Sequence, residues 1–204
     1  LGRNGEGKST LSKMLSNRLD VMHGKMVTSN KLRIGFFAQH QVDELRIEET
    51  PLDHLFRERP NEGQAKLRAR LAGFGLGADQ ADTAVGRLSG GQKARLSLLL
   101  ATLPAPHLLI LDEPTAALGE SDSIRILDMV NRLAKRGKSI VYVSHRMDEI
   151  FKICDRITVL RDGQSQEART AKELDVPSLV ELMLGRELAN MFPAHPEILR
   201  TKPL

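Results

Sequence analysis

The sequence predicts an α/β fold built on a parallel sheet. Three stretches read as strands, at residues 31–37, 108–111 and 139–143, and the middle one is entirely apolar, as expected of a strand covered on both faces. Residues 121–136 have the apolar spacing of a helix, which Gly137 would end. A strand, a helix and a strand in this order indicate a crossover in a parallel sheet. The buried face of that helix is expected to hold Ile124, Leu127, Val130 and Ala134.

Residues 2–9 (GRNGEGKS) match the phosphate-binding (Walker A) pattern G-x-x-x-x-G-K-[ST]. In such a loop the glycines let backbone N–H groups curl around polyphosphate, Lys8 reaches the β and γ phosphates, and the Ser9 hydroxyl holds Mg²⁺. A plain glycine-rich turn before a helix would also satisfy the bare pattern. The helical spacing of the next residues favours the phosphate-binding interpretation and comprises Leu11, Met14, Leu15, Arg18 and Leu19.

The loop and the helix after it predict a P-loop NTPase with ATP and Mg²⁺ as its ligands. Such a loop follows a buried strand, and Leu1 alone stands before it in this sequence. We therefore expect that the N-terminal strands of the sheet are missing. The residues expected to bind the nucleotide are Gly2, Asn4, Gly5, Gly7, Lys8, Ser9 and Thr10.

Two further segments complete the predicted architecture. Residues 45–103, with many Arg, Ala and Leu, are expected to form a small helical subdomain inserted in the core. Residues 157–160 read as a strand that enters a tight turn, since the pair Asp162 and Gly163 readily adopts positive φ.

Composition agrees with one cytoplasmic domain. The chain has 204 residues, 41% of them hydrophobic, which is enough to bury one core. Its most apolar stretch, residues 96–111, falls short of the roughly 20 residues that cross a bilayer, so no direct membrane span is expected. The single cysteine, Cys154, excludes an internal disulfide and suits a reducing compartment. A net charge of +4 permits an anionic partner such as RNA, whereas 3% aromatic content argues against a base-stacking platform.

An acidic pair follows the apolar strand. Asp112 and Glu113 stand at its carboxyl end, the edge at which open α/β sheets bind their ligands. In an ATPase, Asp112 would hold Mg²⁺ through water, and Glu113 would orient and polarise the attacking water. Two solvated acids at a strand end are the alternative interpretation, which the phosphate-binding loop in the same chain disfavours.

A second candidate anion site precedes another predicted helix, over about 92–103. A serine and two glycines there would gather free N–H groups, a hydroxyl and the positive end of the helix dipole, although Ser-Gly-Gly also makes an ordinary helix cap. Together with the phosphate-binding loop and the acidic pair, this segment makes the chain resemble an ABC-type ATPase. The family's signature motif is matched by Ser89, Gly90, Gly91 and Gln92.

The resemblance implies a partner domain. In that family the signature meets the γ-phosphate held by the phosphate-binding loop of a second ABC domain. Two ATP molecules then lie between two head-to-tail domains.

Two single residues extend the resemblance. His145, in VSHR, resembles the family's switch histidine, which contacts the γ-phosphate. Gln39, in FFAQ, resembles the glutamine that senses Mg²⁺ and the attacking water, and Gln41 is the alternative if the loop register differs. Either residue alone would be read as an ordinary polar group at a strand end. The resemblance thus implies a catalytic set of Glu113, His145 and Gln39 and a Mg²⁺ set of Ser9, Gln39 and Asp112.

The resemblance also sets the expected domain boundaries. It implies an ABC ATPase domain over residues 1–185, truncated at its N-terminus, and a linker or tail over 186–204. The aromatic residue that stacks on adenine in this family is expected in the missing N-terminal region. The family's dimer-contacting loop usually ends in Asp, whereas residues 116–119 end in Gly119, a departure that concerns communication between paired sites.

The subfamily resemblance is divided. Residues 34–41 (IGFFAQHQ) resemble the soluble ABC-F class, which acts on ribosomes, and this likeness continues to about residue 111. From about residue 116, segments such as 144–151 (SHRMDEIF) and 184–188 (LGREL) resemble the first ATPase domain of bacterial sugar-import proteins. Because the two likenesses meet at a stretch shared by both classes, residues 109–115, we predict a hybrid sequence.

Three functions follow from these resemblances. The importer class implies an ATP-hydrolysing subunit that energises uptake of a sugar or another small solute, bound to a membrane permease at the inner face of the cell membrane. The ABC-F class implies a soluble ribosome-associated translation factor. A truncated nucleotide-binding fragment without activity is the third function class. The sequence from Ala116 onward favours import.

Overall fold

The computed structural model describes residues 1–3 and 5–185. At its centre lies a parallel sheet whose strands, in spatial order, are β1 (Ile34–Ala38), β2 (Leu108–Asp112) and β3 (Ser139–Val143). Helix α6 (Glu120–Lys135) connects β2 to β3, and Gly137 follows it with a φ of 79°. The α/β class and the three strands are confirmed, with β1 beginning three residues later than predicted.

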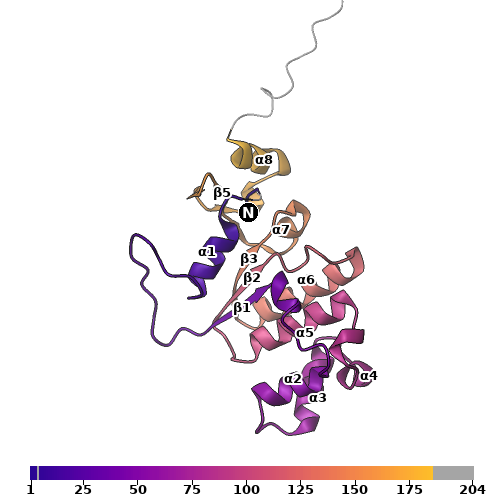
Figure 1. Ribbon diagram of the computed structural model, residues 1–204. Helices are drawn as coiled ribbons and strands as arrows, with labels where there is room; N and C mark the ends of the chain where they lie inside the picture. The colour runs from indigo at the N-terminus through magenta and orange to yellow at the C-terminus, as the bar shows by residue number, and fades with distance from the viewer. Residues whose placement is uncertain (4, 186–204) are drawn as a thin grey trace, which may run out of the picture.

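Helices cover both faces of this sheet, because successive side chains of a strand point to opposite sides. One face packs against α1 (Lys8–Leu15), where Leu15 meets Phe36 and Ile110. The other face packs against α5 (Gly90–Thr102) and α6, and Figure 1 shows these two helices across the strands from α1. The core on that second face comprises Phe37, Ala94, Leu98, Leu109, Leu111, Ile126, Met129 and Val130.

Helix α1 is shorter than its predicted apolar face. It ends at Leu15, and Asn17 then adopts a φ of 57°, a left-handed conformation that a helix cannot continue. Leu19 therefore lies outside the helix. Leu11 and Leu19 are 42% and 43% exposed, so the predicted burial of this face is wrong for both residues.

Helix α6 is rotated relative to its predicted face. Ile124 is 49% exposed and Ala134 is exposed. The carboxylate of Asp122 lies 2.8 Å from the buried guanidinium of Arg95 on α5, and this ion pair turns the neighbouring side of α6 toward α5. The side chains that α6 buries are Ser123, Ile126, Leu127, Met129 and Val130.

Residues 45–103 are helical apart from their connections. The helices are α2 (Pro51–Glu58), α3 (Gln64–Gly73), α4 (Ala78–Ala81), the 3-10 turn η2 (Val85–Arg87) and α5. In Figure 1, α2, α3 and α4 gather at one end of the molecule, away from the N-terminus. Their status as a separate subdomain stays a prediction. The core that they share with α5 comprises Leu45, Leu55, Leu67, Leu71, Leu76, Ala81, Val85, Leu88, Leu96, Leu99 and Leu103.

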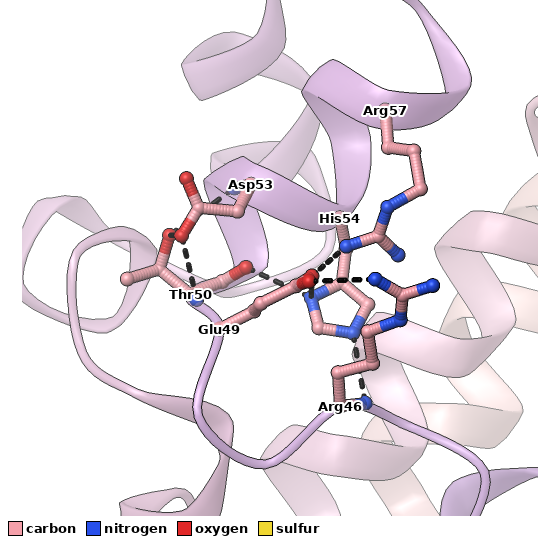
Figure 2. Close-up of polar contacts among 6 residues, drawn as sticks. All are labelled: Arg46, Glu49, Thr50, Asp53, His54 and Arg57. Carbon is pink, nitrogen blue, oxygen red and sulfur yellow. Dashed lines mark hydrogen bonds and ion pairs between the residues drawn. The ribbon is translucent and has the colours of Figure 1, made fainter.

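A cluster of charged side chains fixes the chain where it enters α2 (Figure 2). The Glu49 carboxylate accepts hydrogen bonds from the guanidinium groups of Arg46 and Arg57. Next to it, the buried His54 ring accepts the backbone N–H of Arg46 at Nε2, at 3.2 Å, and its Nδ1 is 2.9 Å from the carbonyl oxygen of Thr50. Because Nε2 is an acceptor, Nδ1 carries the proton and donates it to that carbonyl.

Two backbone hydrogen bonds tie this entry segment to the chain that precedes α5. The N–H of Val85 donates to the carbonyl oxygen of Glu49, and the N–H of Gly86 donates to that of Ile47, both at 2.8 Å. A Cβ on Gly86 would lie 3.2 Å from the Ile47 oxygen, so glycine permits this close approach. The segment after β1 and the segment before α5 are therefore held side by side.

The strand predicted at residues 157–160 is divided in the structure. Its two halves belong to separate antiparallel pairs, β4 (Arg156–Ile157) with β7 (Arg169–Thr170) and β5 (Leu160–Arg161) with β6 (Gln164–Ser165). Between them, Leu1 pairs with the backbone of this segment: its nitrogen donates to the carbonyl oxygen of Thr158, and its carbonyl oxygen accepts the N–H of Leu160. Asp162 and Gly163 have φ of 52° and 71°, which confirms the predicted turn.

The remaining described elements are α7 (Met147–Ile153), the 3-10 turn η3 (Ala171–Glu173) and α8 (Val176–Leu184). Within the described part of the chain, no helix combines the length and the apolar character needed to cross a membrane.

The cap of α2 generates a stability prediction. Thr50 Oγ1 accepts the N–H of Asp53 at 3.1 Å, and Asp53 Oδ2 accepts the N–H of Thr50 at 2.9 Å. We expect Thr50→Ala to lower the free energy of unfolding by about 1 kcal/mol in urea titrations, because a helix N–H loses its acceptor. Thr50→Ser, which keeps the hydroxyl, is the control, and an equal loss in that variant would contradict the assignment.

The same cap predicts a pH dependence. Hydrogen bonds from the side chain and backbone of Thr50 lower the pKa of Asp53. A lowered folded-state pKa means that this contribution is present above the unfolded-state pKa of about 3.9 and is lost as the pH falls through the folded-state pKa. The difference between Thr50→Ala and the wild type should therefore shrink in acid.

Candidate nucleotide-binding site

The predicted phosphate-binding loop wraps around the N-terminus of α1. Gly5 and Gly7 have φ of 90° and 88°, backbone angles that residues with a Cβ rarely adopt. A Cβ on Gly2 would lie 2.4 Å from the carbonyl oxygen of Leu160, so close approach also requires glycine at that position. Gly7 is the N-cap of α1, and the first-turn N–H groups of the helix, which have no intrahelical partner, face this loop.

Lys8 folds back across the loop. Its Nζ donates to the carbonyl oxygens of Gly2 at 2.8 Å and Arg3 at 2.9 Å, and it lies 4.0 Å from Oε1 of Glu113. The lysine side chain is buried, so its charge is held inside the curl of the backbone. A buried ammonium at a helix N-terminus makes this loop attractive to polyanions.

Asp112 ends β2 with a buried carboxylate whose Oδ1 has no hydrogen-bond partner. Burial raises the pKa of Asp112, and a hydrogen bond from Ser9 opposes that rise. A free carboxylate oxygen beside a serine hydroxyl fits a cation that prefers oxygen ligands, such as Mg²⁺. Within the described residues, no group of three His, Cys, Asp or Glu side chains could hold a metal alone. Mg²⁺ at Asp112 would therefore need water or phosphate oxygens as further ligands, which is its usual mode of binding.

Glu113 and His145 meet across two loops. The Glu113 backbone has a φ of 54°, a left-handed conformation that is costly for a residue with a side chain, and its N–H donates to the carbonyl oxygen of Val143 at 2.9 Å. His145 Nδ1 lies 2.9 Å from Glu113 Oε2. The loops that follow β2 and β3 are thus joined by both a backbone and a side-chain contact.

These side chains open onto one cavity of about 430 Å³. Gln39 begins the 3-10 turn η1 (Gln39–Val42) after β1 and lines the cavity, whereas Gln41 turns its Oε1 back to the N–H of Ala38. The structure therefore brings Gln39 to the site and gives Gln41 a local partner. The cavity is lined by Gly5, Gly7, Lys8, Ser9, Thr10, Gln39, Glu113, Ala116 and His145.

Two of the described residues predicted to bind the nucleotide or Mg²⁺ do not line the cavity. Gly2 and Asp112 are described but are not part of the lining, although Gly2 receives the Lys8 ammonium and Asp112 the Ser9 hydroxyl. Asn4 lies outside the described residues. Ala116, which lines the cavity, was not among the predicted site residues.

Residues 89–92 also lie outside the cavity lining. Ser89 caps α5, since its Oγ accepts the N–H of Gln92 at 3.2 Å and Gln92 Oε1 accepts the N–H of Ser89 at 2.8 Å. A Cβ on Gly91 would lie 2.0 Å from Cγ of Asp122, whereas the same position on Gly90 is open space. The structure does not bring this segment to the phosphate-binding loop of the same chain.

The sequence prediction missed a buried network beside the site. Glu149 of α7 is 1% exposed, and its Oε2 accepts the hydroxyls of Thr115 at 2.6 Å and Tyr142 at 2.7 Å. Its Oε1 lies 3.0 Å from Nη1 of Arg146. Burial is the largest cause of a raised pKa at Tyr142. The one local signal is the i,i+3 spacing of Arg146 and Glu149, because Thr115 stands 34 residues from Glu149 in the sequence.

Comparison with known protein families shows to which family the chain belongs. The ABC transporter family matches residues 1–116, which hold the phosphate-binding loop, residues 89–92 and the acidic pair. This chain belongs to the ABC transporter family. Its fold agrees with this, because the chain superposes on the ATP-binding cassette MJ0796 with a TM-score of 0.68. That structure is a dimer in a post-hydrolysis state, bound to ADP and Pi. The two chains are 25% identical, and the match covers 83% of each.

Relatives of both predicted classes match this ABC chain. The ribose import ATP-binding protein RbsA of Chromobacterium violaceum is 36% identical over 95% of the chain and 42% of its own length. The ATP-binding protein YheS of Escherichia coli K12, which is of ABC-F type, is 39% identical over 82% of the chain and 27% of its own length. The chain thus spans less than half of either relative. The double resemblance is confirmed, whereas the hybrid junction stays a prediction because both matches are long enough to cross it.

The buried carboxylate of Asp112 generates a second prediction. Its raised pKa means that the folded state keeps this proton to higher pH than the unfolded state does. The free energy of unfolding therefore falls as the pH rises from the unfolded-state pKa of about 3.9 through the folded-state pKa. We expect Asp112→Asn to remove this dependence and to raise the free energy of unfolding at neutral pH by roughly 1 kcal/mol.

Urea titrations of the nucleotide-free protein from acid to neutral pH measure this effect. Asp128→Asn is the matched control, because Asp128 is an exposed carboxylate on α6. Its replacement should change neither the free energy of unfolding at neutral pH nor the dependence of that free energy on pH. A loss of stability in Asp112→Asn at neutral pH would contradict the inferred cost of the buried charge.

Proposed function

We propose that this domain binds ATP with Mg²⁺ and hydrolyses the ATP to ADP and phosphate. The observation that carries the proposal is the convergence of Lys8, Gln39, Glu113 and His145 on one cavity beside the phosphate-binding loop. In the proposed complex, the backbone N–H groups of the loop and Nζ of Lys8 bind the phosphate oxygens. Membership of the ABC transporter family and the ADP and Pi bound to MJ0796 support this choice of ligand.

Ser9, Gln39 and Asp112 are the proposed Mg²⁺ ligands. Asp112 offers a free buried oxygen beside the Ser9 hydroxyl, and Ser9 and Gln39 line the same cavity. When bound, Mg²⁺ neutralises charge that develops on the β- and γ-phosphates. Bound Mg²⁺ would also offset the cost of burying the Asp112 carboxylate, which would gain a cationic partner.

Glu113 is proposed to orient the attacking water and to accept its proton. Its carboxylate is held between two nitrogens, with Oε2 at 2.9 Å from His145 Nδ1 and Oε1 at 4.0 Å from Lys8 Nζ. His145 is proposed to contact the γ-phosphate from the mouth of the cavity. A doubly protonated imidazole can donate to the phosphate through Nε2 while Nδ1 still bonds to Glu113.

A second ABC domain is proposed to complete the site. Ser89, Gly90, Gly91 and Gln92 lie outside the cavity of their own chain, at the N-terminus of a 13-residue helix, where free N–H groups suit a phosphate. In the proposed head-to-tail dimer they contact the ATP bound by the partner, and MJ0796 is dimeric. The proposed domain spans residues 1–185 with 45–103 as its helical subdomain. The tail expected at 186–204 lies outside the described residues.

Replacement of Glu113 tests the proposed chemistry. We expect Glu113→Gln to lower turnover by roughly 10²–10⁴-fold, about 3–5 kcal/mol in barrier, because an amide cannot accept the proton. Nucleotide binding should stay nearly unchanged. Phosphate release measures the turnover, and light scattering with Mg²⁺ and ATP should detect a dimer of the blocked variant.

The control for this experiment is Glu120→Gln, because Glu120 is an exposed carboxylate at the start of α6. Its turnover should match that of the wild type. Full turnover in Glu113→Gln would mean that the Glu113 carboxylate is an ordinary solvated group at a strand end.

For the process that the ATPase drives, we propose import of a sugar or another small solute. RbsA, a ribose import protein by name, matches 95% of the chain, including most of the part after residue 116. In this proposal the domain is cytoplasmic and lies peripherally at the inner face of the cell membrane, on a permease that carries the solute.

A soluble ABC-F role on ribosomes is the second candidate. It is favoured by the identity to YheS, which at 39% is higher than the 36% identity to RbsA, although over less of the chain. A fragment without activity is the third, and a wild-type chain that binds no ATP and releases no phosphate would indicate it.

Partner binding separates import from the ribosomal role. An importer subunit should co-purify with a permease encoded beside it and should hydrolyse ATP faster when the permease is present. An ABC-F factor should instead co-sediment with ribosomes as Glu113→Gln with ATP, and should dissociate steeply as salt rises, because contacts to RNA phosphates release counterions. Ribosome binding without any permease association would overturn the import proposal.

A further inference from the structure

The buried carboxylate of Glu149 contacts residues of three segments. It accepts the hydroxyls of Thr115, in the loop after β2, and of Tyr142, in β3, and it pairs with the guanidinium of Arg146 at the start of α7. That guanidinium extends on toward Ser123 of α6, whose Oγ is 3.4 Å from Nη1. Thr115 and Arg146 belong to the two loops that form the site, so the carboxylate joins these loops from their buried side.

Glu149 contacts residues that lie close in sequence to both Glu113 and His145. Thr115 stands two residues after Glu113, and Arg146 stands directly after His145. The backbone N–H of Arg146 also donates to Oγ of the fully buried Ser144 at 3.0 Å, which bridges across His145. Glu113 and His145 face each other at 2.9 Å. Each is held in place through a neighbour in sequence, Thr115 or Arg146, that contacts the Glu149 carboxylate.

Fold stability alone gives little reason to keep this arrangement. A fully desolvated carboxylate is costly, and well-packed apolar side chains in place of a buried ion pair often leave a protein as stable or make it more stable. A carboxylate forms charge-assisted hydrogen bonds, which fix the angles and distances of the groups they join. An apolar side chain cannot fix its neighbours in this way. The position of Glu149 behind the Glu113–His145 pair is where such hydrogen bonds would act on the site.

We propose that Glu149 is a positioning residue that sets the distance between Glu113 and His145. It does so by holding Thr115 and Arg146, and it touches neither the nucleotide nor the attacking water. The inference rests on the proposed ATP hydrolysis for its consequence, because the pair it positions is assigned to water activation and phosphate contact. The effect of Glu149 on the contact between Glu113 and His145 can be measured without ATP hydrolysis.

Glu149→Gln is the principal test, because it keeps the size of the side chain and removes the charge that faces Arg146. We expect kcat to fall about ten- to hundredfold, the range for loss of a hydrogen bond to a charged group, with KM changed less than about twofold. Thr115→Val, which removes one donor while leaving the ion pair, should also lower kcat. Thr115→Ser, which keeps the hydroxyl, should stay near the wild type.

A second measurement reports on the pair directly. Long-range ¹H–¹⁵N spectra show which ring nitrogen of a histidine carries the proton, and His145→Gln identifies the His145 signal among the six histidines. In the wild type, Nδ1 should carry the proton because it faces the Glu113 carboxylate. Glu149→Gln and Thr115→Val should both weaken that preference in the nucleotide-free protein.

The matched control is Asp148→Asn. Asp148 is the neighbouring carboxylate on α7 and lies 4.0 Å from Nη2 of Arg146, but its side chain is 59% exposed. This variant should leave kcat and the His145 signal unchanged. If Glu149→Gln does not fold, Thr115→Val and Tyr142→Phe decide, since each removes a single hydroxyl contact.

Two results would overturn the proposal. The first is an unchanged His145 signal in the variants that fold, whatever their turnover. The second is a changed signal with wild-type kcat. A wild-type protein that hydrolyses no ATP would instead refute the proposed function, and the His145 signal would still decide whether Glu149 sets the geometry of the pair.

Discussion

The parallel pairing of β2 with β1 on one side and β3 on the other is the constraint on which the rest of the structure depends. In register, Ala38 lies beside Asp112, and Asp112 lies beside Val143. All three strands therefore end at the same edge, and the residues that follow them leave the sheet together. This is how Gln39 and Glu113, far apart in sequence, come to line one cavity.

Several features at that edge cost stability in the free protein. Asp112 keeps a carboxylate oxygen buried without a partner, and Glu113 holds a left-handed backbone angle. The Lys8 ammonium is satisfied by two loop carbonyls, which are modest partners for a buried charge. A phosphate ligand with its cation would supply the missing counter-charges. Such features are typical of sites in which charges and dipoles are arranged before the ligand arrives.

The sequence by itself determined the features that depend on near neighbours. The glycines of residues 2–9 predicted a backbone that curls, and Gly5 and Gly7 have positive φ in that loop. Gly137 follows the end of α6 as expected. The apolar run at 108–111 became the central strand of the sheet, because a stretch without polar side chains can be buried on both faces of a sheet. In each case the physical cause lies within a few residues, so the local pattern contains it.

The tertiary structure decided the features that depend on distant partners. The ion pair of Asp122 with Arg95, 27 residues away, turns α6 and leaves Ile124 exposed. The strand predicted at 157–160 is divided between two antiparallel pairs, whose partner strands lie at residues 164–165 and 169–170. Glu149 is a buried carboxylate in contact with three segments rather than a solvated helix charge, because Thr115 and Tyr142 are brought to it by the sheet. Side-chain pairing across elements follows from how those elements pack, and no spacing along the chain encodes it.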